Sequence, residues 1–363
     1  MKKEITVKYE GKDCYKIYIT TGFDSLNDKL EEAGLMSGKK ICVVSDSNVA
    51  SLYMDKIQSV LRNKYEKVCS FVFDAGEQSK NTDTVGRLYE YLIKEHFDRN
   101  DFLIALGGGV VGDLTGFAAA TYMRGISFVQ VPTSLLSQVD SSIGGKTGVD
   151  HMMYKNMVGA FHMPSLVYMN LEVLKSLPEK QFSNGMAEII KHGLIKDKSY
   201  YDFLKTNYSS VKAQDPDTVA EMIARSCNIK REVVERDPKE KGERALLNFG
   251  HTAGHAIEKL SDFALFHGEC VSLGTVAAAY ISMKKGMISA ENVSDIEDTL
   301  KLYGLPVRIS GYDPASVLAA TKSDKKMSGK KIRFILLKEI GEAYIETSLE
   351  DEEILEGIRY VTE

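Results

Sequence analysis

A short apolar run, Phe102–Leu106, leads directly into three glycines, and a run with helical character, Leu114–Met123, follows them. A strand that enters a glycine turn and continues as a helix is typical of an anion-binding turn in an α/β sheet. Glycines let backbone N–H groups approach a phosphate, and the helix N-terminus adds partial positive charge. Gly107, Gly109 and Gly112 also have the spacing G-x-G-x-x-G. This stretch therefore favours an α/β sheet that binds a phosphate-containing ligand.

The glycine spacing is weak on its own, because glycine after a buried strand is also common in ordinary turns. A dinucleotide-binding unit usually has an acidic residue about 20 residues further on, at a strand end. The corresponding window, Phe128–Val131, contains no acid, whereas Asp46 follows an earlier apolar run, Ile41–Val44. We therefore predict a phosphate-binding turn that lies outside the usual first βαβ unit.

Strand-like and helix-like runs alternate through the first half of the chain. The strand-like runs cover residues 39–45, 67–73, 102–106 and 126–131, after a hairpin pattern at 4–9 and 15–20. This alternation predicts an α/β domain over residues 1–178, with a mostly parallel, Rossmann-like sheet that binds ligands at the carboxyl ends of its strands. Beyond Pro178 strand signals nearly vanish, so we predict an all-α domain over residues 179–363. The strand-like run 331–337 has no predicted place in it.

Composition limits the partners that this chain can have. The net charge of −5 argues against nucleic acid, whose partners are basic. The five scattered cysteines fit a reducing compartment better than a disulfide framework. No segment approaches the roughly 20 apolar residues that cross a bilayer, and the N-terminus has no signal-peptide run. We expect a cytoplasmic protein with a small-molecule partner, and neither nucleic acid nor a membrane as a partner.

Three of the seven histidines, His251, His255 and His267, are crowded into one segment. His251 and His255 are four residues apart, which places them on one face if the segment is helical. Glu188 lies in an apolar helical run, where an unpaired carboxylate would be costly. Two or three of these histidines with one carboxylate would make a zinc site with an open position. The alternatives are surface or hydrogen-bonded histidines, and His192, one turn after Glu188, as a rival ligand.

Several basic residues stand beside small or apolar ones rather than in charged runs. They are Lys146, Lys155 with Asn156, Lys191, Arg244 with Asn248, and the pair Lys325 and Lys326. Such residues around a pocket suit a small substrate with phosphate and carboxylate groups, although a solvated charged face is the alternative. A P-loop is excluded, because its first glycine would fall at residue 140, which is Asp140.

Taken together, these stretches resemble the 3-dehydroquinate synthase family of the sugar-phosphate cyclase superfamily. The segments that carry the resemblance are GEQSK (76–80), GGGVVGDLTGF (107–117), VPTSLLSQVDSSIGGKTGV (131–149), KNMVGAF (155–161), GMAEIIKHG (185–193), RALLNFGHTAGHAIE (244–258), HGE (267–269) and DKK (324–326). The family fold has an NAD-binding α/β domain and a helical, metal- and substrate-binding domain, which agrees with the predicted boundary.

The resemblance also implies roles for individual residues. Zinc, with cobalt as a possible substitute, would be held by Glu188, His251 and His267, so that neither His255 nor His192 is a ligand. The implied NAD contacts are Asp46, Asn48, Glu77, Lys80, Gly108, Gly109, Asp113, Thr133, Ser134, Lys146 and Lys155. The implied substrate contacts are Arg124, Asp140, Lys146, Asn156, Lys191, Lys230, Arg244, Asn248 and Lys326. The implied catalytic groups are His255, Glu240, Lys146, Arg244 and Asn248.

The activity that the resemblance implies is the conversion of 3-deoxy-D-arabino-heptulosonate 7-phosphate to 3-dehydroquinate and phosphate. NAD would be reduced and reoxidised within each turnover, with β-elimination of phosphate and an aldol ring closure. A homodimer is the family's usual assembly. The competing functions are another sugar-phosphate cyclase, a metal-dependent NAD alcohol dehydrogenase on the same fold, and a sensor that keeps the NAD site.

Overall fold

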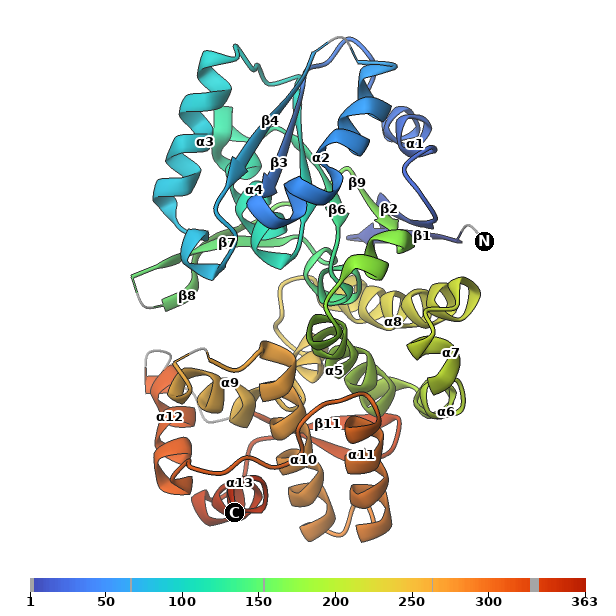
Figure 1. Ribbon diagram of the computed structural model, residues 1–363. Helices are drawn as coiled ribbons and strands as arrows, with labels where there is room; N and C mark the ends of the chain where they lie inside the picture. The colour runs from blue at the N-terminus through green and yellow to red at the C-terminus, as the bar shows by residue number, and fades with distance from the viewer. Residues whose placement is uncertain (1–2, 66, 153, 263, 327–332) are drawn as a thin grey trace. The chain divides into compact units, whose positions relative to one another are not determined.

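The chain forms two compact units in the computed structural model, which describes residues 3–65, 67–152, 154–262, 264–326 and 333–363 (Figure 1). The first unit is Met1–Leu177 with Val219–Arg231, and the second is Pro178–Thr218 with Glu232–Glu363. The sequence predicted a single boundary after residue 178. The structure differs in that the middle of helix α8 (Pro216–Arg236) belongs to the first unit. A helical pattern shows which face of a helix is buried, but not which domain covers it.

The first unit is built on a sheet that, in the described part of the chain, has seven strands in the order β1-β2-β9-β6-β5-β3-β4. Its strands are β1 (Lys3–Tyr9), β2 (Lys12–Thr20), β3 (Ile41–Asp46), β4 (Val68–Phe73), β5 (Phe102–Gly107), β6 (Ser127–Pro132) and β9 (Leu166–Asn170). All neighbouring pairs are parallel except β1 with β2. The predicted Rossmann-like, mostly parallel sheet is therefore confirmed.

Helices cover both faces of this sheet (Figure 1). They are α1 (Leu26–Glu32) and α2 (Ser47–Arg62) on one face, and α3 (Thr82–Lys94) and α4 (Gly109–Thr121) on the other. The central strand β5 shows why its sequence is apolar without interruption: Phe102 and Ile104 face α1 and α2, while Leu103 and Ala105 face α3 and α4. A strand covered on both faces loses the polar–apolar alternation of a half-exposed strand.

The chain order of the strands reverses between β3 and β5, which are neighbours in the sheet. Ligands of open α/β sheets bind at the carboxyl ends of the strands at such a switch point. Asp46 ends β3 and caps α2, since its Oδ1 accepts the N–H groups of Asn48 and Val49, both at 2.9 Å. Gly108 is the N-cap of α4, directly after β5. The acid and the glycine turn, which lie about 60 residues apart in sequence, thus meet at one edge of the sheet.

A hairpin of β7 (Lys146–His151) and β8 (Tyr154–Phe161) follows β6, and the sequence did not predict it. Its glycines look like turn residues, but they lie opposite each other inside the hairpin. A Cβ on Gly148 would lie 2.8 Å from Val158 O, and one on Gly159 would lie 2.4 Å from Thr147 O. Here glycine permits two strands to approach closely, which composition alone cannot distinguish from a turn.

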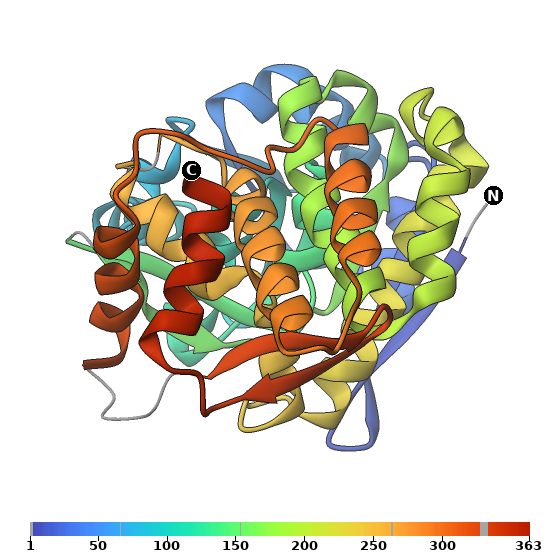
Figure 2. The same cartoon turned by 90° about the horizontal axis from the view of Figure 1, so that it is seen from below.

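The second unit is helical, as predicted. Its helices are α5 (Glu179–Lys196), α6 (Lys198–Thr206), α7 (Tyr208–Lys212), α9 (His251–Leu260), α10 (His267–Lys284), α11 (Ala290–Leu302), α12 (Pro314–Lys326) and α13 (Asp351–Thr362), together with the ends of α8. The described residues also include a hairpin of β10 (Phe334–Glu339) and β11 (Glu342–Glu346), visible in red in Figure 2. It is tied to α10 by Leu337 N, which donates to Ser282 Oγ at 3.0 Å.

The hairpin accounts for most of the strand-like run 331–337, whose first two residues lie outside the described residues. Within the part of the chain that the structure describes, no helix has the length and apolarity that crossing a bilayer requires.

Replacing Asp46 tests the cap at the carboxyl end of β3. Asp46→Ala removes the acceptor for two backbone N–H groups and should lower the free energy of unfolding by about 1 kcal/mol. Asp46→Asn keeps an acceptor and should retain most of that stability. Urea unfolding of the ligand-free protein measures both, and an equal loss in the two variants would contradict the capping role.

Candidate functional site

Helices α9 and α10 touch each other at the level of their backbones. A Cβ on Gly274 of α10 would lie 1.8 Å from Gly250 O, and one on Gly254 of α9 would lie 2.7 Å from Cys270 O. Gly250 is the N-cap of α9 and has φ +79°, a conformation that favours glycine. Only glycine therefore lets the start of α9 come this close to α10.

This contact brings together the first residue of each helix. His251 begins α9 and His267 begins α10, and their ring centroids lie 5.4 Å apart. Helix α5 supplies the third member: Asn184 Oδ1 accepts the N–H of Gly268 at the start of α10, and Glu188 follows one turn later. Asn184 thus holds the N-terminus of α10 against the helix that carries Glu188.

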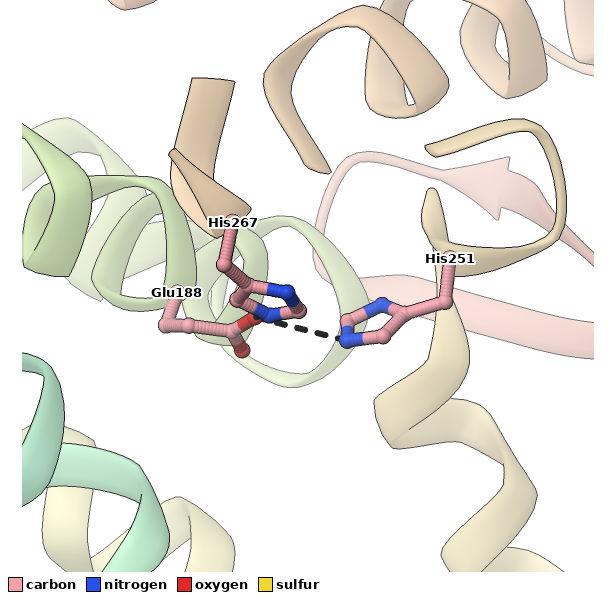
Figure 3. A group of neighbouring side chains, drawn as sticks. All are labelled: Glu188, His251 and His267. Carbon is pink, nitrogen blue, oxygen red and sulfur yellow. Dashed lines mark ion pairs between the residues drawn. The ribbon is translucent and has the colours of Figure 1, made fainter. Parts of the chain in front are cut away.

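The three side chains point toward one another (Figure 3). Glu188 Oε1 lies 3.5 Å from His251 Nε2 and 3.4 Å from His267 Nε2. One ligand atom from each residue lies within 4.8 Å of those of the other two. The structure thus brings together the three residues predicted as metal ligands. His192, the rival ligand, is fully buried in α5 and also has a ring nitrogen within 4.8 Å of a Glu188 carboxylate oxygen.

The protonation states of Glu188 and His251 suit a divalent metal. Burial alone raises the pKa of Glu188, but Lys191 and the two histidines outweigh burial and hold this pKa well below its ordinary value. Burial, with the Lys191 charge beside it, lowers the pKa of His251 well below its ordinary value. The cluster therefore offers an ionised carboxylate and a neutral imidazole, both of which are ligand forms.

The contacts of these side chains direct the ligand atoms toward one another. Both carboxylate oxygens of Glu188 are buried, and among the described residues they face Lys191 Nζ and the Nε2 atoms of His251 and His267. The Nδ1 atom of His251 lies 3.1 Å from Phe249 O, which directs the other ring nitrogen toward Glu188. Two imidazoles and one carboxylate are the donor set of a catalytic zinc site with an open position. The residues fit the metal that the sequence predicted.

Lys191 lies beneath this group rather than at a solvent-facing surface. Its side chain is 1% exposed, its Nζ pairs with Glu188, and it donates to Leu247 O at 2.6 Å. The predicted substrate contact of Lys191 stays a prediction. What the structure adds is that its charge keeps Glu188 ionised.

A hollow of about 380 Å³ in the second unit opens beside the histidines and collects further predicted residues. His255, Glu240 and Asn248 line it together with His251. Asn248 Nδ2 donates to Glu240 Oε1 at 3.1 Å, and the ring centroids of His255 and His251 lie 5.0 Å apart. The hollow is also lined by residues that the sequence analysis did not single out: Thr252, Lys259, Thr321 and Arg333.

Arg244 lies at the start of the 3₁₀ turn that leads into α9, and it is 3% exposed. Its Nη1 donates to Pro238 O at 2.8 Å, and its backbone N–H donates to Asp237 Oδ2 at 3.1 Å. The first bond orients the guanidinium, and the second holds the backbone of Arg244, both within the second unit. Lys326, another predicted substrate contact, ends α12, and its side chain lies outside the described residues.

In the first unit the structure brings together two groups of predicted residues. Lys80 Nζ donates to Asp113 Oδ2 at 2.7 Å and to Asn156 Oδ1 at 2.6 Å, which joins two predicted NAD contacts to a predicted substrate contact. Lys230, in the part of α8 that belongs to this unit, donates to the carbonyl and carboxylate oxygens of Asp140. Asn156 lies in β8 and has φ +55°, a left-handed conformation that asparagine adopts more readily than most residues.

The remaining predicted residues of the first unit follow the strands. Asp46 and Asn48 lie after β3, Glu77 in the short helix after β4, Gly108 and Gly109 after β5, and Thr133 and Ser134 after β6. Lys146 begins β7 and Lys155 lies in β8, while Arg124 is exposed in the turn before β6. A dinucleotide bound along the carboxyl edge of the sheet would meet most of these residues.

One residue close to the histidines was missed. Glu258 lies on α9, and its Oε2 is 3.5 Å from His267 Nδ1. Burial lowers the pKa of His267, but hydrogen bonding with Glu188 and Glu258 outweighs burial and raises it to about 9. The available signal was helical spacing: His251, His255 and Glu258 follow one another at intervals of four and three residues.

A Rossmann-like unit with a glycine turn at its switch point, and a helical unit with a histidine–carboxylate group, define a class of nucleotide- and metal-binding α/β proteins. Family models described as 3-dehydroquinate synthase N-terminal and C-terminal match residues 70–184 and 185–327. The 3-dehydroquinate synthase of Acetivibrio thermocellus is 44% identical over 345 residues, which cover 95% of each chain. The chain belongs to the 3-dehydroquinate synthase family.

Solved structures of other cyclases share this fold. The 2-epi-5-epi-valiolone synthase of Streptomyces hygroscopicus, with NAD+ and Zn2+ bound, is 26% identical with a TM-score of 0.87, over 98% of this chain and 99% of that one. A 2-deoxy-scyllo-inosose synthase complexed with carbaglucose-6-phosphate, NAD+ and Co2+ is 25% identical with the same TM-score and coverage. The NADH-dependent butanol dehydrogenase A of Thermotoga maritima, at 14% identity and a TM-score of 0.70, shows a likeness of fold alone.

Substituting Gly274 tests the backbone contact between α9 and α10. In Gly274→Ala the new Cβ meets the carbonyl of Gly250, so the helices must separate, at a cost of about 1–3 kcal/mol or more. Metal uptake should fall together with stability. Gly86→Ala, at a helical glycine with open space around it, is the control and should leave both unchanged or slightly raise stability. Thermal unfolding and metal analysis measure the effect, and normal metal uptake in Gly274→Ala would contradict it.

Proposed function

We propose that this chain is a 3-dehydroquinate synthase, which converts 3-deoxy-D-arabino-heptulosonate 7-phosphate to 3-dehydroquinate and phosphate. The observation that carries the proposal is the convergence of Glu188, His251 and His267 in a chain that is 44% identical to a curated enzyme of that name. The sugar-phosphate cyclases of similar fold that were solved with NAD+ and with Zn2+ or Co2+ support the cofactor assignment.

Each unit would contribute one cofactor site. Glu188, His251 and His267 would hold the zinc ion in the second unit, and Asp46 with the turn at Gly108 would bind NAD in the first. A metal held there would supply Lewis acidity toward a substrate hydroxyl, and bound NAD would supply reversible hydride transfer, so that the overall reaction would not be redox.

Residues around the hollow would handle protons and anionic groups. His255 and Glu240 line it with Asn248, and an imidazole and a carboxylate are the usual acid–base groups. The Arg244 fork suits a carboxylate, because two of its N–H groups can bond both oxygens. In the first unit Lys146 and Asn156 would supply a cationic and an amide donor for the phosphate, and Lys230 would supply a cation for the carboxylate. Holding a flexible sugar at several points favours one conformer for ring closure.

We further propose that the enzyme works as a homodimer in the cytoplasm. All five cysteines lie in the described residues as free thiols, which agrees with a reducing compartment. The homodimer rests on the family resemblance, and a monomer in light scattering at working concentration would contradict it.

One assay tests the reaction. Zinc-loaded protein with the heptulosonate phosphate and catalytic NAD should release phosphate and form the carbocycle without net accumulation of NADH. Chelation with EDTA should stop turnover, and added Zn2+ or Co2+ should restore it. Stoichiometric NADH would indicate an alcohol dehydrogenase. Turnover of a different sugar phosphate only would indicate another cyclase.

The metal ligands are tested by variants that separate binding from folding. His251→Ala should abolish zinc binding in a folded protein. Glu188→Ala should also lose zinc. Because this change leaves the buried Lys191 charge without its carboxylate partner, it should also lower the free energy of unfolding by about 3–5 kcal/mol. The double variant Glu188→Met with Lys191→Met removes both charges and should recover stability without recovering zinc. Zinc at wild-type stoichiometry in the double variant would remove Glu188 from the ligand set.

A further inference from the structure

His267 lies between two carboxylates, one at each ring nitrogen. Its Nε2 lies 3.4 Å from Glu188 Oε1, and its Nδ1 lies 3.5 Å from Glu258 Oε2. Glu188 comes from α5 and Glu258 from α9, so the imidazole that begins α10 is held from both neighbouring helices. Glu188 belongs to the proposed metal ligands, whereas Glu258 has no role in the function described above.

Glu258 is a buried carboxylate. Its side chain is 10% exposed, compared with 29% for His267, and a buried carboxylate is costly unless a donor compensates it. Its place on α9 follows from helical spacing: three residues beyond His255 and seven beyond His251, it lies on the same side of the helix. One helix thus supplies a proposed ligand, His251, and a carboxylate directed at another proposed ligand, His267.

The two histidines then have matching arrangements. A neutral imidazole has one N–H donor and one acceptor nitrogen, so a partner that accepts from Nδ1 leaves the lone pair on Nε2 for a metal. For His251 this partner is the backbone carbonyl of Phe249, at 3.1 Å. For His267 the group in the corresponding position is the carboxylate of Glu258. Such outer carboxylates fix the ring orientation and raise the basicity of the ligand nitrogen.

We propose that Glu258 is a positioning residue of the metal centre, which accepts the Nδ1 hydrogen of His267 and thereby fixes the tautomer and orientation in which His267 binds the metal. The inference rests on the metal site of the proposed function. It concerns how tightly that site holds a metal, not which reaction it catalyses.

A second arrangement is possible from the same atoms and serves as the rival. His255, Glu258 and His267 also place one ligand atom each within 4.8 Å of one another, so Glu258 could bind a second ion. The positioning role is favoured because His267 would otherwise have to coordinate metals through both nitrogens at once, and because His255 is exposed in the hollow. The two roles differ in metal stoichiometry.

The experiment measures metal affinity by competition with a chelator, together with the visible absorption spectrum of the Co2+-loaded protein and its thermal midpoint. Glu258→Ala should bind one metal about 10–100-fold more weakly than the wild type, with an altered Co2+ spectrum. Glu258→Gln keeps an oxygen acceptor in the same volume, so it should recover part of this affinity and should resemble the wild-type spectrum. Because Gln has the volume of Glu but lacks its charge, a residue that only filled space would be replaced by Gln without any loss of affinity.

Glu297 offers a matched control on the same unit. Its side chain is 12% exposed and it is bonded to Arg308 Nη2 at 3.0 Å and to Tyr360 Oη at 2.9 Å. Glu297→Ala and Glu297→Gln should lower thermal stability but leave metal affinity and the Co2+ spectrum unchanged. Any loss of metal affinity caused by general destabilisation would appear in this pair as well.

Three outcomes would overturn the inference. Wild-type metal affinity in Glu258→Ala would show that Glu258 does not act on His267. Two metals in the wild type and one in Glu258→Ala would make Glu258 a direct ligand. A wild-type protein that takes up no divalent metal would overturn both this inference and the proposed function, whereas the first two outcomes leave the proposed function intact.

Discussion

The candidate metal centre depends on the backbone contact between α9 and α10. At Gly250 and Gly274 there is no room for a single additional carbon atom, and this closeness sets the 5.4 Å between the rings of His251 and His267. Both histidines are the first residues of their helices, where a small change in helix separation moves the whole side chain. Asn184 then connects the start of α10 to α5, which carries Glu188. Three helices are thus held together by one close backbone contact and one hydrogen bond to a side chain, without any contribution from a metal.

Electrostatic contacts determine the charge state of the side chains that the packing brings together. A fully buried carboxylate is unstable unless it is compensated, and Glu188 is compensated by Lys191, which in turn donates to the carbonyl of Leu247. The result is a carboxylate that stays ionised at neutral pH and faces the Nε2 atoms of His251 and His267. The same logic applies around the histidines, where Phe249 and Glu258 lie at the ring nitrogens that point away from Glu188. The contacts that stabilise these buried side chains are therefore the same contacts that prepare them to bind a metal.

Much of the first unit could be predicted from the sequence. The apolar runs of β3, β5 and β6 are long enough and isolated enough that their strands follow directly, and Asp46 stands out in the sequence as the acid that follows the β3 run. The hairpin of β7 and β8 was missed because glycine has two opposite uses, in turns and in close strand contacts. The sequence also did not predict that the middle of α8 belongs to the first unit. A helical pattern shows which face of a helix is buried, but not which unit buries it.

Around the candidate site, the sequence by itself determined which residues are candidate ligands: a carboxylate in an apolar helix, and histidines spaced to share one helix face. Spacing favoured His251 with His255 as a ligand pair, and only the family resemblance replaced His255 by His267. The tertiary structure decided which side chains meet, that Lys191 lies against Glu188, and that Glu258 lies behind His267. The physical reason is that periodicity orders residues within one helix, whereas a ligand set is assembled across three. That assembly depends on how closely their backbones can approach.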